Sequence, residues 1–321
     1  MRICWKNLLL VLVAAGCDSG GNDADGKKSV EVIRVGHFPN ITHAQALVAR
    51  RKRWFEERLG VKIEWYSYNA GPSAMEAIFA KGLDITYVGP SPALNAYLRS
   101  GGEEIRIIAG AAVGGSALVV QGDGSLKSPA DFRGKRVATP QLGNTQDVAC
   151  RAWLKKNGFQ ITQTGGDVTV IPTLNPDQLN LFQSKNLDAV WTVEPWVSRL
   201  EMEGGGKIFL EEKTAVTTVL VSRAAFLAEQ KDLVKRFADA HAELTDWIAK
   251  NEDEAKKLVG AELEALTTRA VPAELLDRSW KRLTLNTAIE LAPLKDMVRQ
   301  AQEVGYLTEM GDLSKLVAVP R

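Results

Sequence analysis

The chain has 321 residues, of which 45% are hydrophobic and 25% charged, and its formal net charge at pH 7 is +1. A chain of this length and apolar content can bury a sizeable core. The near-neutral charge, without a basic tract, excludes nucleic acid as an expected partner.

The N-terminus carries the features of an export signal. Met1–Lys6 is positively charged, and the apolar run Leu8–Ala15 is far shorter than the roughly 20 residues that span a bilayer. Small residues then precede Cys17, as in a cleavage region. This arrangement resembles a bacterial lipoprotein signal, in which residues 1–16 are removed and Cys17 is lipidated. The alternative is an ordinary signal peptide that happens to contain a cysteine.

The polar, glycine-rich residues 17–29 are predicted to form a flexible tether. The protein is therefore expected to be exported and lipid-anchored to the cell membrane, on its periplasmic or extracytoplasmic face. Arg2 and Lys6 belong to the predicted signal. Without them the chain has 38 basic and 39 acidic residues, so the net charge expected for the mature protein is −1. Only Cys150 then remains outside the signal and the lipid site, which leaves no partner for an intramolecular disulfide. We expect Cys150 to lie in the core.

From residue 30 the chain alternates apolar strand patterns with helical patterns. Strands are predicted at 32–35, 61–66, 85–88, 105–109, 117–120, from 137, 168–171, 189–193 and 216–221. Beyond residue 223 the pattern is helical, over 226–249, 252–259, 273–283 and 292–304. This order predicts an α/β fold with parallel-rich sheets.

Capping patterns mark the expected helix starts. Thr42 with Gln45, and Ser73 with Glu76, have the spacing of capping boxes. Ser91 before Pro92 is typical of an N-cap followed by a first-turn proline. Asn144 with Asp147 is predicted to start the helix that carries Cys150.

Two stretches, 72–84 and 176–188, resemble each other at a separation of 104 residues. In register, Pro72 matches Pro176, Lys81 matches Lys185, and Asp84 matches Asp188. Gly82 and Asn186 match in role, because both tolerate the left-handed conformation that ends a helix. The repeat predicts two similar lobes with a cleft, although any two βαβ units share some of these features.

The strand order suggests how the chain divides into lobes. We assign residues 30–119 and 220–321 to lobe I and residues 120–219 to lobe II. The chain would then cross between lobes twice, near 117–122 and 216–222. Two crossings favour a hinge that lets the lobes close on a ligand.

Four segments carry a resemblance to a known family: residues 35–44, 84–93, 189–196 and 217–222, which include Gly-Pro-Ser and Glu-Pro-Trp. Over residues 30–321 the chain resembles periplasmic solute-binding proteins of ABC importers, in the sulfonate, nitrate, taurine and bicarbonate branch. The resemblance implies a two-lobed type II periplasmic-binding-protein fold with a two-strand hinge and C-terminal helices. It also implies a monomer that holds its ligand between the lobes and delivers it to an ABC-transporter permease.

Ligands of open α/β sheets bind beyond the carboxyl ends of strands. Helix starts there offer free backbone N–H groups and a positive dipole end, which favour an anion. The candidate ligand-binding residues are His37, Phe38, Asn40, Thr42, Ser91, Ser116, Asn144, Thr145, Gln146, Glu194 and Trp196. Each hydroxyl could instead only cap its own helix. For Ser73 we favour capping, and for Ser91 and Thr145 both interpretations stay open.

Glu194 suits an amino-bearing ligand such as taurine or a hydrogen bond at the hinge, and we favour the structural role. Trp191 and Trp196 could line the pocket or lie in the core. His37 and His43 lack the spacing of a helical metal pair and have no Cys or carboxylate cluster beside them. We therefore expect neither a metal site nor a cofactor.

The favoured function is capture of a small anion, most of all an aliphatic sulfonate or a taurine-like compound. Nitrate, bicarbonate or a thiamine-pyrimidine precursor are the alternative ligands. An alternative of another class is a pyrimidine- or menaquinone-pathway enzyme on the same fold. Against an enzyme, the sequence shows no Ser/His/Asp set, no metal-ligand cluster and no phosphate loop.

Overall fold

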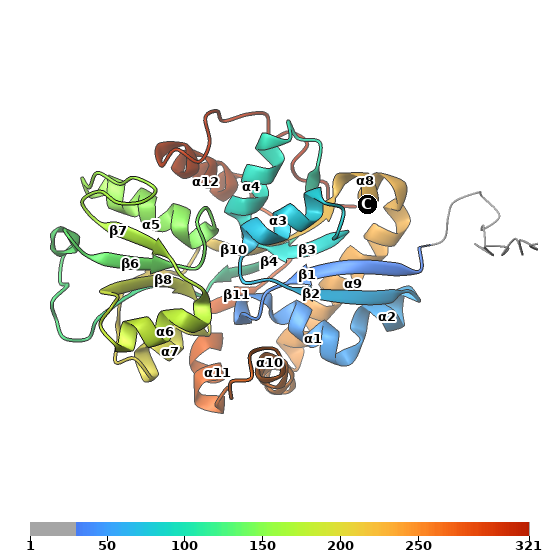
Figure 1. Cartoon of the computed structure of the whole chain (residues 1–321). Coiled ribbons are helices and arrows are strands. Elements are labelled where there is room, and N and C mark those ends of the chain that lie inside the picture. Colours follow the sequence, from blue (N-terminus) through green and yellow to red (C-terminus); the bar gives the residue numbers. More distant parts are fainter. Residues whose placement is uncertain (1–29, 321) are drawn as a thin grey trace, which may run out of the picture. The chain divides into compact units, whose positions relative to one another are not determined.

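Two mixed β-sheets with helices on their faces make up the described part of the chain (Figure 1). The computed structural model describes residues 30–320. The predicted signal peptide 1–16, the lipid site Cys17 and the tether 17–29 lie outside these residues. No helix within residues 30–320 combines the length and apolar character that a membrane crossing needs.

The first sheet has six strands. Their spatial order is β11 (Leu283–Leu285), β4 (Ile105–Gly114), β10 (Val216–Arg223), β3 (Ile85–Val88), β1 (Val32–His37) and β2 (Lys62–Ser67). β1 lies parallel to β2 and β3, whereas β10 is antiparallel to β3 and β4.

The second sheet has five strands. Their spatial order is β7 (Thr169–Pro172), β6 (Arg136–Thr139), β8 (Ala189–Val193), β5 (Ser116–Val120) and β9 (Lys207–Glu212). β6 lies parallel to β7 and β8, whereas β5 is antiparallel to β8 and β9. Both sheets thus have three parallel strands followed by one antiparallel strand that arrives from another part of the chain.

The repeat seen in the sequence forms the same set of contacts in each sheet. Arg34 on β1 donates to Asp84 and, through Nη1, to the Lys81 carbonyl. Arg136 on β6 donates in the same way to Asp188 and the Lys185 carbonyl. The left-handed residues are the lysines, with φ of 57° and 59°, and the expectation that Gly82 and Asn186 take this role was wrong. The lysine carbonyls accept from the arginines, which holds the turns at these positions.

Helices cover both sheets. In chain order they are η1 (Ile41–His43), α1 (Ala44–Lys52), α2 (Trp54–Leu59), α3 (Gly71–Phe79), α4 (Pro90–Arg99), η2 (Pro129–Phe132), α5 (Thr145–Lys156), α6 (Asn175–Gln183), α7 (Trp196–Met202), α8 (Ala224–Glu229), α9 (Lys231–Lys250), α10 (Glu252–Thr267), α11 (Ala273–Trp280) and α12 (Leu291–Glu303). The nine predicted strands are confirmed, but β9 and β11 were not predicted, and the single helix expected over 226–249 is interrupted at Gln230.

The core follows the alternation of the strands. Leu118 and Val120 of β5 pack with Trp191 on one face of the five-stranded sheet, and Val119 packs with Val190 on the other. Cys150 is buried in the first of these clusters, as predicted, and burial raises the pKa of its thiol.

Two of the expected capping boxes were wrong. α3 begins at Gly71, two residues before Ser73, and the Ser73 hydroxyl pairs with the side chain of Gln141 instead. The Gln45 amide donates to the Ala111 carbonyl, so Gln45 is unavailable as a cap. α4 begins at Pro90, so Ser91 is not its N-cap. The fourth helix start is confirmed, because Asn144 Oδ1 accepts from the Asp147 N–H at 2.8 Å.

The chain passes between the sheets at two neighbouring places. It leaves β4 through Gly114 and Gly115, both with positive φ, and it returns from β9 to β10 through residues 213–215. The Gly114 N–H donates to the Ala215 carbonyl, which ties the two passages together. The division into lobes 30–119 with 220–321 and 120–219 stays a prediction, and strand membership places both passages a few residues earlier.

The C-terminal helices pack against helices that cover the first sheet and against helices that cover the second. α12 packs against α4 of the first sheet and α5 of the second, and α11 packs against α7 and α10. Figure 1 shows α12 on one side of the two sheets and α10 with α11 on the other. Just beyond α12, the Tyr306 hydroxyl donates to Asp147 at 2.6 Å, near the start of α5.

Candidate functional site

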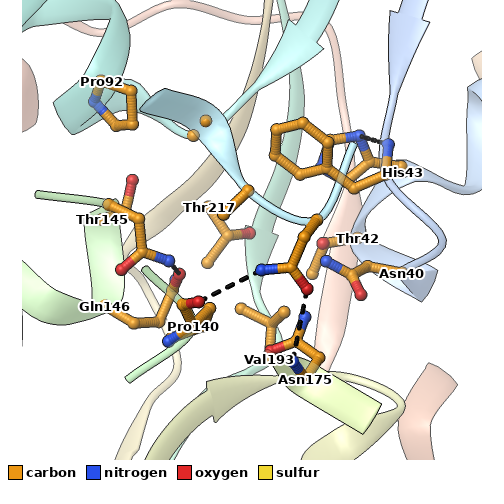
Figure 2. A pocket seen from close by; sticks show the side chains of 16 residues that line it. Asn40, Thr42, His43, Pro92, Pro140, Thr145, Gln146, Asn175, Val193 and Thr217 are labelled. Atoms are coloured by element: carbon orange, nitrogen blue, oxygen red, sulfur yellow. Dashed lines mark hydrogen bonds between the residues drawn. The ribbon is translucent and has the colours of Figure 1, made fainter. Parts of the chain in front are cut away.

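A small cavity lies where the two sheets face each other, lined by residues of both (Figure 2). From the first sheet come residues after β1, after β2 and after β3, and Thr217 at the start of β10. From the second come residues after β6 and β7, and Val193 at the end of β8. All the parallel strands involved present their carboxyl ends, the edge at which α/β sheets bind ligands.

The cavity is narrow. Its volume is about 20 Å³, and on this measure a single water needs about 10–15 Å³. A larger ligand therefore requires the lobes to separate or a lining side chain to move.

Four helices start at the cavity wall, two from each sheet. The residues at these starts that line it are Gly71 of α3, Gly89 before α4, Asn144 and Thr145 of α5, and Asn175 of α6. Backbone N–H groups of a first helical turn have no partner within the helix, and the positive dipole end adds to their preference for an anion. At α4 and α6 these groups are not free, because the Ser91 and Asn175 N–H groups donate to side chains and the adjacent prolines have none, so α3 and α5 are the helix starts that can offer them. None of the described lining residues is Asp, Glu, Lys or Arg.

Contacts cross the cleft around the cavity. The Ser91 N–H donates to Thr145 Oγ1 at 3.3 Å. The approach is close, because a Cβ at Gly89 would lie 2.4 Å from the same oxygen. Asn69 bridges to the second sheet twice, donating to the Pro140 carbonyl at 3.1 Å and accepting from the Asn175 N–H at 3.3 Å.

His43 lines the cavity as a neutral donor. The Phe38 N–H donates to His43 Nδ1 at 3.3 Å, so the proton of the neutral ring sits on Nε2. Burial lowers the pKa of His43 well below its usual value, with a smaller effect from His37. The ring also packs against Phe38, with centroids 4.4 Å apart.

Six of the predicted ligand-binding residues line this cavity together. They are Phe38, Asn40, Thr42, Asn144, Thr145 and Gln146. Five others, namely His37, Ser91, Ser116, Glu194 and Trp196, lie outside its lining. The ligand contacts themselves stay a prediction for the six.

Glu194 belongs to a buried polar network. Its carboxylate accepts from Arg282 Nη1 at 2.8 Å, from the Ser279 hydroxyl at 2.9 Å, and from both the N–H and the hydroxyl of Ser198. Burial raises the pKa of Glu194, and Arg282 opposes this effect. These contacts engage the carboxylate of Glu194, which is not among the residues lining the cavity, and its structural role stays a prediction.

The other four have different surroundings outside the cavity lining. Trp196 donates its indole N–H to Asn40 Oδ1 at 3.2 Å, which orients that amide. Ser116 donates to Glu212 at 2.6 Å beside the passage between the sheets. His37 is fully buried against Trp65, and burial lowers its pKa to about 4. Ser91 lines a second pocket, to which Thr145 also contributes.

The other ten lining residues were not predicted as ligand-binding, namely His43, Asn69, Ala70, Gly71, Gly89, Pro92, Pro140, Asn175, Val193 and Thr217. The internal repeat carried a usable signal for two of them, because Gly71 and Asn175 each precede the proline of a repeated helix. Asn69 and Thr217 have no local pattern that marks them. Among residues 30–320, no group of three or more His, Cys, Asp or Glu side chains could hold a metal ion.

Related sequences match most of the chain. A profile of the NMT1-like family matches residues 26–261. A protein of Bacillus subtilis (strain 168) named for the binding of aliphatic sulfonates is 30% identical over 268 residues, which cover 79% of this chain and 77% of the relative. The taurine-binding periplasmic protein of Escherichia coli (strain K12) is 26% identical over 199 residues, 60% of this chain and 59% of that protein.

Solved structures share the fold. The alkanesulfonate-binding protein of Xanthomonas axonopodis pv. citri, bound to MOPS, superposes with a TM-score of 0.76 at 17% identity. The match covers 90% of this chain and 99% of that protein. The periplasmic nitrate-binding protein of Synechocystis PCC 6803 superposes with a TM-score of 0.73 at 16% identity. The match covers 87% of this chain and 82% of that protein. At these identities the likeness shows the fold alone.

Proposed function

The chain belongs to the NMT1-like family, and from this premise we propose that it captures a small anion, first of all an aliphatic sulfonate, and delivers it to the permease of an ABC importer. Its fold is the two-lobed α/β fold of type II periplasmic binding proteins, with a two-strand hinge and C-terminal helices. Its relatives are named as binding proteins, so it is a binding protein of this branch and not an enzyme. Periplasmic relatives imply a location outside the cytoplasm.

One observation carries the choice of an anion. Helix starts from both sheets open into one cavity, and within the described residues no ionised side chain lines it. Fixed neutral donors can hold a sulfonate or nitrate without a salt bridge, because the donors are already oriented when the ligand arrives.

Nitrate is the second candidate ligand. The cavity of about 20 Å³ favours an ion with few atoms, and both an alkanesulfonate and a thiamine-pyrimidine precursor would require it to widen. Apolar lining from Phe38, Pro92 and Val193 instead suits the short alkyl chain of a sulfonate.

A thermal-shift screen tests the proposal. The panel contains alkanesulfonates, nitrate, bicarbonate, phosphonates and pyrimidines, and calorimetry follows for each hit. A ligand at 100 times its dissociation constant stabilises the folded state by about 2.7 kcal/mol. A shift with pyrimidines alone, and none with any anion, would contradict the proposal.

We also propose that Cys17 carries a lipid that anchors the protein to the membrane. The proposal is supported by the short apolar run and small residues before Cys17 in the sequence. The variant Cys17→Ser is expected to be soluble or to keep its signal peptide, as fractionation and mass measurement would show. Normal processing together with recovery in the membrane fraction would rule out the anchor.

A further inference from the structure

The cavity presents hydrogen-bond donors to a ligand but no counter-charge for an ammonium group. Resting on the proposed function, we propose that the site takes short sulfonates and similar oxyanions that carry no ammonium group, and that it rejects zwitterions such as taurine. The relevant contrast is between two ligands of equal length, one ending in a methyl group and the other in an ammonium group.

Two buried carboxylates close to this region in the fold, Glu194 and Asp147, are already used. Glu194 accepts four hydrogen bonds from Ser198, Ser279 and Arg282. Asp147 accepts from Thr139, from the Gly143 N–H, from Arg151 and from Tyr306. Neither carboxylate lines the cavity. An ammonium group inside it would therefore be a buried charge without a partner, which is strongly unfavourable.

The amide oxygens around the cavity are also occupied. Asn40 Oδ1 accepts from the Trp196 indole, Asn69 Oδ1 from the Asn175 N–H, and Asn144 Oδ1 from the Asp147 N–H. Each of these partners can only donate, so the oxygen and nitrogen ends of the three amides are fixed. Asn144 Nδ2 in turn donates to Gln146 Oε1 at 3.1 Å, which fixes a fourth amide.

The groups left for a ligand are mainly donors. With their oxygens engaged, Asn40 and Gln146 present their NH₂ groups, and His43 presents its Nε2–H. Thr145 Oγ1 accepts from the Ser91 N–H, so its own proton is free to be donated. Thr217 is the exception, because its single hydroxyl proton is directed to the Gly114 carbonyl at 2.8 Å, with the Ala112 carbonyl at 3.2 Å, and its lone pairs stay available. The Thr42 hydroxyl, which also lines the cavity, can accept as well. These neutral oxygens supply no counter-charge for an ammonium group.

Calorimetry with propanesulfonate and taurine at pH 7 tests the inference. The two ligands share the sulfonate and the chain length and differ in the terminal group. Propanesulfonate is expected to bind at least about tenfold more tightly than taurine, because the ammonium loses its hydration without gaining a counter-charge.

The variant Asn40→Asp supplies the missing charge. Its carboxylate can still accept from the Trp196 indole, so the local packing is retained. The variant is expected to bind propanesulfonate at least about tenfold more weakly and to narrow the gap to taurine. Asn186→Asp, an exposed change of the same charge, is the control and should leave both affinities unchanged.

The outcomes separate the two levels of the proposal. Taurine within tenfold of propanesulfonate in the wild type would overturn the inference and leave the proposed function intact. An unchanged ratio in a folded Asn40→Asp variant would also overturn it. If no sulfonate and no other small anion binds the wild type, the proposed function itself fails.

Discussion

At the scale of single residues, Thr145 and Ser91 differ although their helices meet. The Thr145 side chain lines the cavity, whereas Ser91 contributes only its backbone N–H to the contact between them. Thr145→Ala is expected to weaken anion binding by about 1–3 kcal/mol, since an anion would lose one donor. Ser91→Ala should leave the affinity unchanged and is the matched control. Equal losses in calorimetry would place the ligand beside Ser91 and not in the cavity.

The single residues also show where sequence reasoning stops. Asn144 was predicted both as a cap and as a site residue. The cap could be predicted because the three-residue spacing to Asp147 is a local sequence pattern, and the Asp147 N–H does donate to Asn144 Oδ1. Glu194 could not be assigned from its neighbours, since its partners Ser279 and Arg282 lie more than 80 residues later in the chain. His43 was considered only as a metal ligand, because its role depends on the backbone N–H of Phe38.

At the scale of elements, the passage after β4 requires glycine. Gly114 has a φ of +77°, and a Cβ there would lie 2.5 Å from the Arg282 carbonyl oxygen. Gly134 has a similar φ of +75° with nothing within 4 Å. Gly134→Ala is expected to lower the free energy of unfolding by about 1–2 kcal/mol through backbone strain alone. Gly114→Ala should lower it further, because the backbone must also move.

Urea denaturation of both variants measures the difference. Equal losses would mean that the passage between the sheets yields easily and is not held by the Arg282 segment. A larger loss for Gly114→Ala, with weaker anion binding, would tie this glycine to the geometry of closure.

Elements with a strong local pattern were predicted, and those defined by distant partners were not. The parallel strands β1, β3, β6 and β8 are apolar runs and were found within a few residues. β9 contains the charged residues Lys207, Glu211 and Glu212 and is only partly buried, so its sequence does not stand out as a strand. β11 is three residues long and exists as a strand through its pairing with β4.

At the scale of the whole molecule, closure of the lobes is testable by small-angle scattering. The cavity of about 20 Å³ is enclosed by residues of both sheets. A population of open molecules should therefore shift to the closed form when a confirmed ligand is added, which lowers the radius of gyration. An unchanged radius of gyration at saturation would contradict ligand-driven closure if the free protein is open. The variant Asn69→Ala, which loses two contacts across the cleft, tests that condition. A larger radius for ligand-free Asn69→Ala than for the ligand-free wild type would mean that the wild type is already closed.

Stability should fall in mild acid. All three histidines of the chain have a lowered pKa through burial, to about 4 for His37 and His241 and well below its usual value for His43. Between pH 6.5 and about 4 the unfolded chain therefore binds more protons than the folded chain, and stability is lost as pH falls. The loss reaches about 1.4 kcal/mol per pH unit for each histidine.

Urea denaturation at about pH 7 and about pH 5 measures this loss. Glu194, with its raised pKa, acts in the opposite direction at the acid end. The variant His37→Phe keeps an aromatic ring against Trp65 and removes one titrating imidazole. The Nε2 of this imidazole has no hydrogen-bond partner in the folded protein, so its removal breaks no bond at that atom. The slope of stability with pH should become shallower in this variant, and an unchanged slope would show that His37 does not titrate as assigned.

The two sheets differ in how their strands are distributed along the chain. Every strand of the five-stranded sheet lies within residues 116–212. The six-stranded sheet is assembled from residues 32–114 and from β10 and β11, which are synthesised much later. Even the buried ion pairs of Asp84 include Arg223, which lies 139 residues further along. The second sheet can therefore form from one continuous stretch of chain, whereas β3 and β4 lack the strand that lies between them until β10 is present.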